Sequence, residues 1–244
     1  MSRRQGNITF QKNPHGFSCF YFNKKTRARG IHKLLKEILY PNTDILKQTL
    51  YSQRRKKKKK RKHKGNALVS AQQRGCQIDR DIMVWSKEGD RADMKEMHPF
   101  SRKLITAFYE WKWTPVEAQG YVGMEQCRVA TAFDLLVRNA DKQLVLLEIK
   151  SDTGCLFEST DEKHIPRFEH PDLSGFYNNG LNRALIQVAL TARYFHATRP
   201  SHQKIHQTYV VRVDDDRVKR YEQDMSLITS AMPIVEEELV KRIR

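Results

Sequence analysis

The chain of 244 residues, 39% of them apolar, is long enough for one sizeable core and too long for a simple charged tail. Its formal net charge is +17, with +19 on residues 1–75 and −2 on residues 76–244. The longest apolar runs, such as Leu144–Leu147, are far shorter than the roughly 20 residues that cross a bilayer, so we expect neither a membrane-spanning nor a secreted protein. The four cysteines show no C-x-x-C spacing, which indicates ordinary thiols in a reducing compartment and no iron–sulfur cluster.

Residues 1–65 are predicted to form a basic, partly disordered arm. The run Arg54–Lys64 cannot bury its like charges and has to stay solvated. Its cations, Lys58 and Lys60 among them, would bind a phosphate backbone through counterion release, and a solubilising linker is the alternative. The run also fits a nuclear-import signal, which favours the nucleus. The absence of Asp and Glu from the first 36 residues keeps a mitochondrial presequence as the alternative.

One short helix is expected within this arm. Leu34, Leu35, Ile38 and Leu39 have helical spacing, and Pro41 closes the segment. We expect an accessory helix rather than a domain.

Residues 66–215 alternate between helical and extended patterns, which predicts one α/β domain. Apolar or small residues recur at gaps of three and four from Leu68 to Trp85, and a second helical pattern lies between Pro99 and Pro115. Three extended runs follow at 116–122, 128–137 and 144–151. A loop at 152–180 then leads to an amphipathic helix at 181–195 and a closing strand at 208–213. We therefore expect helices around a mixed sheet, with residues 216–244 as a C-terminal helical extension.

The strand Leu144–Ser151 ends in two charged residues, although the rest of it is apolar. Side chains alternate along a strand, so Glu148 and Lys150 share one face. If the turn spans Ala140–Lys142, Asp134 on the preceding strand lies opposite Glu148, with Cβ atoms about 4.5–5.5 Å apart. Facing carboxylates repel each other, and a raised pKa, a basic partner or a cation relieves the repulsion. Oxygen ligands of this kind suit a hard divalent cation best.

Asp134 and the triplet Glu148-Ile149-Lys150 resemble the two signature elements of the PD-(D/E)xK nuclease superfamily. The alternative for these residues is an exposed Glu–Lys pair beside a surface acid. Further features resemble the branch of RecB-type and phage-recombination exonucleases. Gly75, which directly follows Arg74, and Asp79 have the spacing of that branch's Gly-x-x-x-His element, with Asp in place of His.

Two more features of the chain resemble the same branch. Glu117 matches an acid upstream of the core aspartate, and Gln187 with Tyr194 matches a Q-x₆-Y arrangement on the helix after the core. Arg183, Gln187 and Tyr194 form a polar stripe opposite the apolar face of that helix, so they are expected to reach into the cleft. An ordinary solvated helix face is the alternative.

The resemblance covers about residues 68–213 and implies a restriction-endonuclease-like core that binds Mg²⁺, or Mn²⁺ in its place. The implied metal ligands are Asp134, Glu148, the Ile149 carbonyl, Asp79 and Glu117. Lys150 would orient the attacking water, and Gln187 would lie beside it in the active site. The implied DNA contacts are Arg74, Arg183, Gln187 and Tyr194.

The function that follows is a metal-dependent DNA exonuclease of replication, recombination or repair, including that of a DNA virus. DNA is the implied partner, and a single-strand-binding or annealing protein is a further candidate. A structure-specific endonuclease and a non-catalytic nucleic-acid-binding protein remain open as alternatives. No G-x-x-x-x-G-K-[ST] motif is present, so no nucleotide cofactor is expected.

Overall fold

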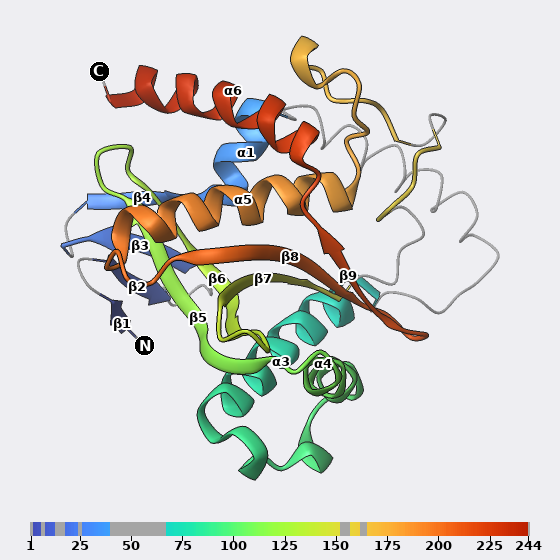
Figure 1. Cartoon of the computed structure of the whole chain (residues 1–244). Coiled ribbons are helices and arrows are strands. Elements are labelled where there is room, and N and C mark those ends of the chain that lie inside the picture. The colour runs from blue at the N-terminus through green and yellow to red at the C-terminus, as the bar shows by residue number, and fades with distance from the viewer. Residues whose placement is uncertain are drawn as a thin grey trace.

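The computed structural model describes residues 2–5, 8–12, 18–23, 26–39, 67–151, 157–161 and 165–243 (Figure 1). The basic run Arg54–Lys64, with Lys58 and Lys60, lies outside these residues, so its role stays a prediction. The helices are α1 (Ile31–Leu39), α3 (Ala67–Glu88), α4 (Pro99–Glu110), α5 (Gly180–Thr198) and α6 (Met225–Ile243). Three short 3₁₀ helices span Gly89–Arg91, Met94–Glu96 and Pro171–Leu173.

Nine strands of the described residues form one mixed sheet. They are β1 (Ser2–Gln5), β2 (Ile8–Lys12), β3 (Ser18–Phe22), β4 (Thr26–Gly30), β5 (Thr114–Met124), β6 (Val129–Arg138), β7 (Leu144–Lys150), β8 (Ile205–Val213) and β9 (Val218–Glu222). β5, β6 and β7 form an antiparallel meander, α5 returns the chain so that β8 lies parallel to β7, and β9 is antiparallel to β8. The predicted α/β class with a mixed, helix-flanked sheet is confirmed.

The hairpin between β6 and β7 has the register expected from the sequence. Asn139 closes the turn, because its N–H donates to the Gln143 carbonyl and its side-chain oxygen accepts the Gln143 N–H. Lys142 takes the positive φ of 61° that the tight reversal requires. Leu135 consequently lies opposite Leu147 in the last pair of this ladder, and Asp134 stands one residue beyond it.

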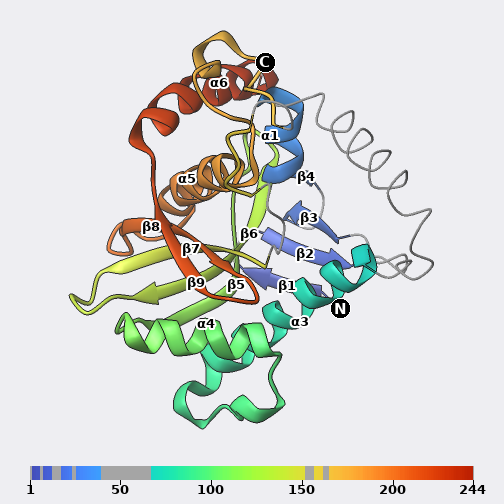
Figure 2. The same cartoon turned by 90° about the vertical axis from the view of Figure 1, so that its right-hand side faces the viewer.

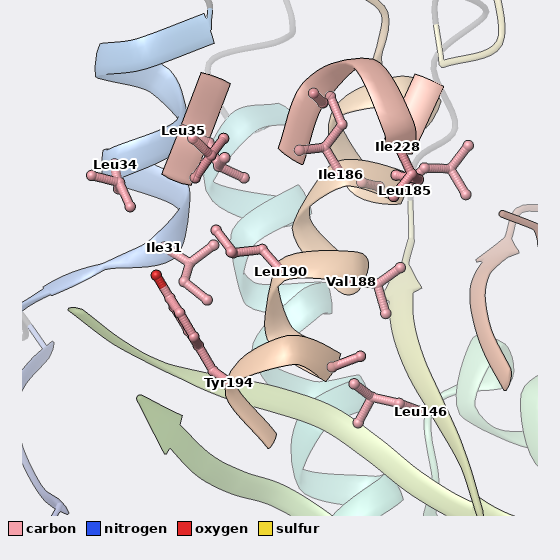
Figure 3. Packing of buried hydrophobic residues seen from close by; sticks show 14 of the residues in the cluster. Ile31, Leu34, Leu35, Leu146, Leu185, Ile186, Val188, Leu190, Tyr194 and Ile228 are labelled. Atoms are coloured by element: carbon pink, nitrogen blue, oxygen red, sulfur yellow. The ribbon is translucent and has the colours of Figure 1, made fainter. Parts of the chain in front are cut away.

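The sheet separates two apolar layers (Figure 2). On one face, α3 and α4 pack through residues such as Trp85 and Phe108 against Val145 and Leu147. On the other face, α5 lies against the sheet, and α1 and α6 cover α5 from outside (Figures 2 and 3). α5 is therefore buried on two sides, whereas the sequence predicted a helix with a single apolar face.

A buried carboxylate fixes α4 to α3. Asp81 on α3 is 5% exposed and accepts hydrogen bonds from the Gln77 side chain, the His98 N–H and the Ser101 hydroxyl. His98 in turn caps α4 by accepting the Phe100 N–H. This network sets the position of the helix that carries Asp79.

The prediction of a basic arm at residues 1–65 is wrong for those of its residues that the structure describes. β1–β4 extend the main sheet through the parallel pair of β4 with β6. α1, expected as an accessory helix, inserts Ile31, Leu34, Leu35 and Leu39 into the main core, where each side chain is fully buried. The physical reason is that α5 presents a second apolar side, which needs a covering helix.

The C-terminal segment is likewise part of the domain rather than an extension beyond it. β9 completes the sheet, and α6 inserts Leu227, Ala231, Val235 and Leu239 into the core shared with α1 and α5. Among the described residues, none of the helices combines the length and apolar character needed to span a bilayer.

The burial of α1 predicts that Leu35→Ala lowers the free energy of unfolding by about 2–5 kcal/mol, because it leaves a cavity against α5 and α6. Lys33→Ala on the exposed side of the same helix is the control, expected within about 0.5 kcal/mol of wild type. Denaturant titration of both variants measures the difference. Equal stability of the two would show that α1 is a dispensable accessory.

Candidate active site

The candidate site lies where one edge of β6 changes its neighbour. β5 pairs with β6 along its whole length, so the other two neighbours of β6 share its second edge. β4 pairs there with Val129 and Ala130, whereas β7 pairs with Leu135–Arg138. Among the described strands, none pairs with residues 131–134 on this edge, and Asp134 is the last of these residues.

Asp134 bridges this gap to the end of β7. Its Oδ2 atom accepts a hydrogen bond from the Ile149 N–H, with 2.7 Å between nitrogen and oxygen. Burial, followed by the negative charge of Glu148, raises the pKa of Asp134 well above its usual value. Lys150 opposes this rise, and Asp79 adds to it. Asp134 therefore sits in a group of mutually interacting charges.

Glu148 is the most enclosed charge of the group. It is 4% exposed, and its Oε1 atom accepts hydrogen bonds from Lys150 Nζ at 2.5 Å and from Gln187 Nε2 at 2.8 Å. A buried carboxylate without partners is strongly unfavourable, so both donors compensate for its desolvation. Gln187 reaches it from α5, which lies over the same face of β7.

Asp79 joins the group from α3, which packs on the opposite face of the sheet from α5. Desolvation of its carboxyl group, and then the negative charge of Glu148, raise the pKa of Asp79 to about 6, while Lys150 acts to lower it. The residue as a whole is exposed, so solvent still reaches part of the side chain. The structure thus brings together Asp79, Asp134, Glu148, Lys150 and Gln187, which come from α3, β6, β7 and α5.

The donor chemistry of this group suits a hard divalent cation. Three carboxylates share one lysine, and burial followed by the negative charge of Glu148 raises the pKa values of Asp79 and Asp134. In the part of the chain that the structure describes, no three His, Cys, Asp or Glu side chains converge as a ready-made metal cluster. Glu148 is turned to Lys150 and Gln187, so ligation requires its carboxylate to exchange these partners.

Two predicted DNA-contacting arginines flank the group. Arg74 on α3 donates from Nη2 to the Ser151 carbonyl at 3.2 Å and lies over the Phe100 ring, whereas its Nε–H is buried without a hydrogen-bond partner. Arg183 on α5 donates to the side chain and the carbonyl of Asn178. Both guanidinium groups are therefore engaged within the fold, so the predicted DNA contacts of Arg74 and Arg183 stay predictions.

Glu117 of β5 forms an ion pair with a residue outside this group. Its carboxylate pairs at 3.0 Å with Arg199, which follows the C-terminal end of α5. A guanidinium already balances this charge, so the predicted role of Glu117 as a metal ligand gains no support.

Tyr194 requires a correction. It is 1% exposed and belongs to the main core, where burial raises its pKa above the usual value. Figure 3 shows its ring beside Ile31 of α1. Ile186, Leu190 and Tyr194 follow each other at intervals of four and form the second buried side of α5. Stacking of Tyr194 on a DNA base is excluded in this fold.

No protein-family model matches the chain, and no curated protein is similar to it. The resemblance to the PD-(D/E)xK superfamily thus rests on the residues of the site.

The structure adds a cluster beside the site that the sequence analysis missed. Arg212 of β8 lies opposite Lys150 of β7 and forms an ion pair with Glu158 at 2.9 Å. Lys219 and the Tyr221 hydroxyl also donate to Glu158, so the segment after β7 is fastened to the β8–β9 hairpin. The signal was a single cation near the end of the apolar strand TYVVRV, which mirrors Lys150 in LVLLEIK.

The raised pKa of Asp79 predicts that its charge destabilises the metal-free fold at neutral and alkaline pH. Its pKa rises on folding from 3.8 to about 6, so the folded state loses stability as pH increases across this interval. Asp79→Asn removes that loss. We expect a gain in the free energy of unfolding on the order of 1 kcal/mol at pH 8, discounted for solvent screening, and none near pH 3.5.

Denaturant titration in EDTA at both pH values measures this gain. Asp141→Asn, in the exposed β6–β7 turn, is the control and should show no such pH dependence. A gain from Asp79→Asn that is the same at both pH values would contradict the electrostatic explanation.

Proposed function

We propose that the protein is a divalent-metal-dependent deoxyribonuclease of the PD-(D/E)xK kind. The observation that carries the proposal is the group around Glu148, in which Asp79, Asp134, Lys150 and Gln187 arrive from separate elements. A mixed sheet with helices on both faces is compatible with the restriction-endonuclease-like core that the resemblance implies. Charged side chains are expensive to gather beside an apolar core, so a chemical role is the best explanation for them.

Asp134, Glu148 and the Ile149 carbonyl would hold the cation, with Asp79 as a fourth oxygen donor. When bound, Mg²⁺ or Mn²⁺ would supply Lewis-acid polarisation of the phosphate and a lower pKa for a water molecule. Asp79 in place of an imidazole makes the set entirely oxygen-based, which favours Mg²⁺ and Mn²⁺ over softer ions.

The chain's own residues would position the reactants. Lys150, which donates to Glu148, would orient the attacking water and offset charge on the phosphate. Gln187 would keep the Glu148 carboxylate in place from α5. Arg74, whose Nη2 atom donates to the Ser151 carbonyl, would add positive charge beside the phosphate.

The proposed substrate is DNA, held without sequence preference by phosphate contacts. An exonuclease is favoured over an endonuclease by the Gln187 helix that the resemblance identifies. The non-catalytic alternative explains the basic run but gives no reason for an enclosed Glu148 with two dedicated donors.

Cleavage of end-labelled linear DNA and of closed circular DNA, each with Mg²⁺ and with EDTA, tests the proposal. Glu148→Gln keeps the shape of the side chain and removes its charge, and Lys150→Met keeps an unbranched side chain and removes the charge of the lysine. We expect each variant to lower the metal-dependent rate by about 10²-fold or more, because each removes several kcal/mol of transition-state stabilisation. Glu110→Ala, an exposed residue at the end of α4, is the control.

Loss of linear DNA alone would establish the exonuclease, whereas nicked circles would favour the endonuclease. No cleavage by the wild-type protein with Mg²⁺ or Mn²⁺, combined with salt-sensitive binding, would replace the proposal with the non-catalytic alternative.

The basic run is expected to raise affinity without taking part in chemistry. Replacing Arg54–Lys64 with a Gly/Ser segment of equal length should weaken DNA binding and flatten its dependence on salt, because counterion release falls with each lost cation. The replacement changes no residue of α1 or α3. Binding titrations at several salt concentrations measure how steeply DNA affinity falls with salt. An unchanged slope would leave the run only its predicted role as a nuclear-import signal.

A further inference from the structure

Gln119 has an unusual backbone conformation inside β5. Five residues other than glycine have a positive φ among the described residues, and four of them lie in turns or bends between elements. Gln119, with a φ of 54°, is the exception, because it lies within a strand. A residue with a side chain rarely adopts this left-handed conformation, and strand residues are normally extended. Residues held in such conformations gather at functional sites, where the surrounding structure maintains them.

Gln119 is the β5 neighbour of Asp134. The ladder between β5 and β6 pairs residues 118 and 120 with residues 135 and 133, so Gln119 and Asp134 are the residues between these two pairs. Adjacent strands lie about 4.8 Å apart. On the other edge of β6, the ladder with β7 begins only at Leu135. Among the described strands, β5 is therefore the one that holds the backbone at Asp134.

β6 changes its buried face at Asp134. Residues two apart in a strand normally point to the same face of the sheet. Leu135 nevertheless packs in the layer of α3 and α4, whereas Phe133 packs in the layer of α5. Asp134 thus stands at the boundary between the two layers. This place explains how one carboxylate interacts both with Glu148, which α5 contacts, and with Asp79 on α3.

β5 makes the same change of face beside it. Residues three apart in a strand normally point to opposite faces, yet a side chain added at Gly120 would collide with the Glu117 carboxylate. Glu117 and Gly120 thus face the same layer, and the left-handed backbone of Gln119 between them accounts for it. α3 and α5 both pack against β5, so the change occurs between the helices that carry Asp79 and Gln187 (Figure 1).

We propose that Gln119 is a positioning residue for Asp134. Its left-handed backbone turns β5, and with it the paired β6, so that the Asp134 carboxylate reaches the Ile149 N–H at 2.7 Å. With an extended backbone at residue 119, the alternation of faces would continue, and Phe133 or Leu135 would leave its apolar layer. Glycine at this position should therefore serve as well as glutamine, whereas a β-branched residue should not. The role of Asp134 as a metal ligand rests on the proposed function, but its position in the fold does not.

Amide hydrogen exchange at Ile149, measured by NMR on the full-length protein without metal, reports the position of Asp134, because the Asp134 carboxylate accepts this N–H. We expect Gln119→Thr to speed this exchange about tenfold or more, and Gln119→Gly to leave it within about twofold of wild type. Gln207→Thr is the matched control, the same substitution in β8 at a residue without a positive φ. Unchanged exchange at Val145 in the same strand would separate repositioning of Asp134 from a general loss of stability.

Titration with Mn²⁺, followed by electron paramagnetic resonance, tests the metal separately. Gln119→Thr should weaken Mn²⁺ binding about tenfold or more, as loss of a residue that orients a ligand does, and Gln119→Gly should stay within about twofold of wild type. Asp134→Asn should remove the binding. Absence of Mn²⁺ binding by the wild-type protein would contradict the proposed function, whereas exchange at Ile149 would still decide the positioning role.

Unchanged exchange at Ile149 in folded Gln119→Thr would overturn the positioning role. Equally fast exchange in Gln119→Gly would also overturn it, because the side chain rather than the backbone would then be responsible. Should Gln119→Thr fail to fold, Gln119→Ala takes its place in the comparison with Gln119→Gly, since a Cβ atom alone disfavours a positive φ.

Discussion

The enclosed carboxylate of Glu148 is the constraint on which the arrangement of the molecule depends. It ends an apolar strand at 4% exposure, and only Lys150 and Gln187 make that burial tolerable. Gln187 can reach it only if α5 lies directly over β7, and Lys150 only if both share one face of the strand. The crossover that places α5 there also sets β8 parallel to β7, so one interaction links the site to the topology of the sheet.

The internal position of α5 explains the remainder of the architecture. A helix that contacts the sheet on one side and carries Ile186 and Leu190 on another needs a second layer. α1 and α6, from opposite ends of the chain, supply that layer (Figure 3). Residues that composition assigned to an arm and an extension are consequently part of one core.

The strand pairing at the site was predictable because its cause is local. A short turn at Asn139–Lys142 fixes the register of β6 and β7 up to the Leu135–Leu147 pair, and Asp134 and Glu148 are the next residues of the two strands. Gln187 was identified by resemblance rather than by physics. Glu117 and Tyr194 were assigned by the same resemblance, which carries no information about Arg199 or α1 as their neighbours. Arg212 and Glu158 went unnoticed because their ion pair joins segments far apart in the chain.

The sequence by itself determined the α/β class, the order of the core elements and the concentration of charge at the end of β7. These features follow from periodicity and turn chemistry, which act over a few residues. Only the tertiary structure decided which faces of each helix are buried, that Asp79 joins Asp134 and Glu148, and that Gln119 beside Asp134 takes a left-handed backbone. Those outcomes depend on contacts between distant segments, and a single helix or strand pattern does not specify what covers its second face.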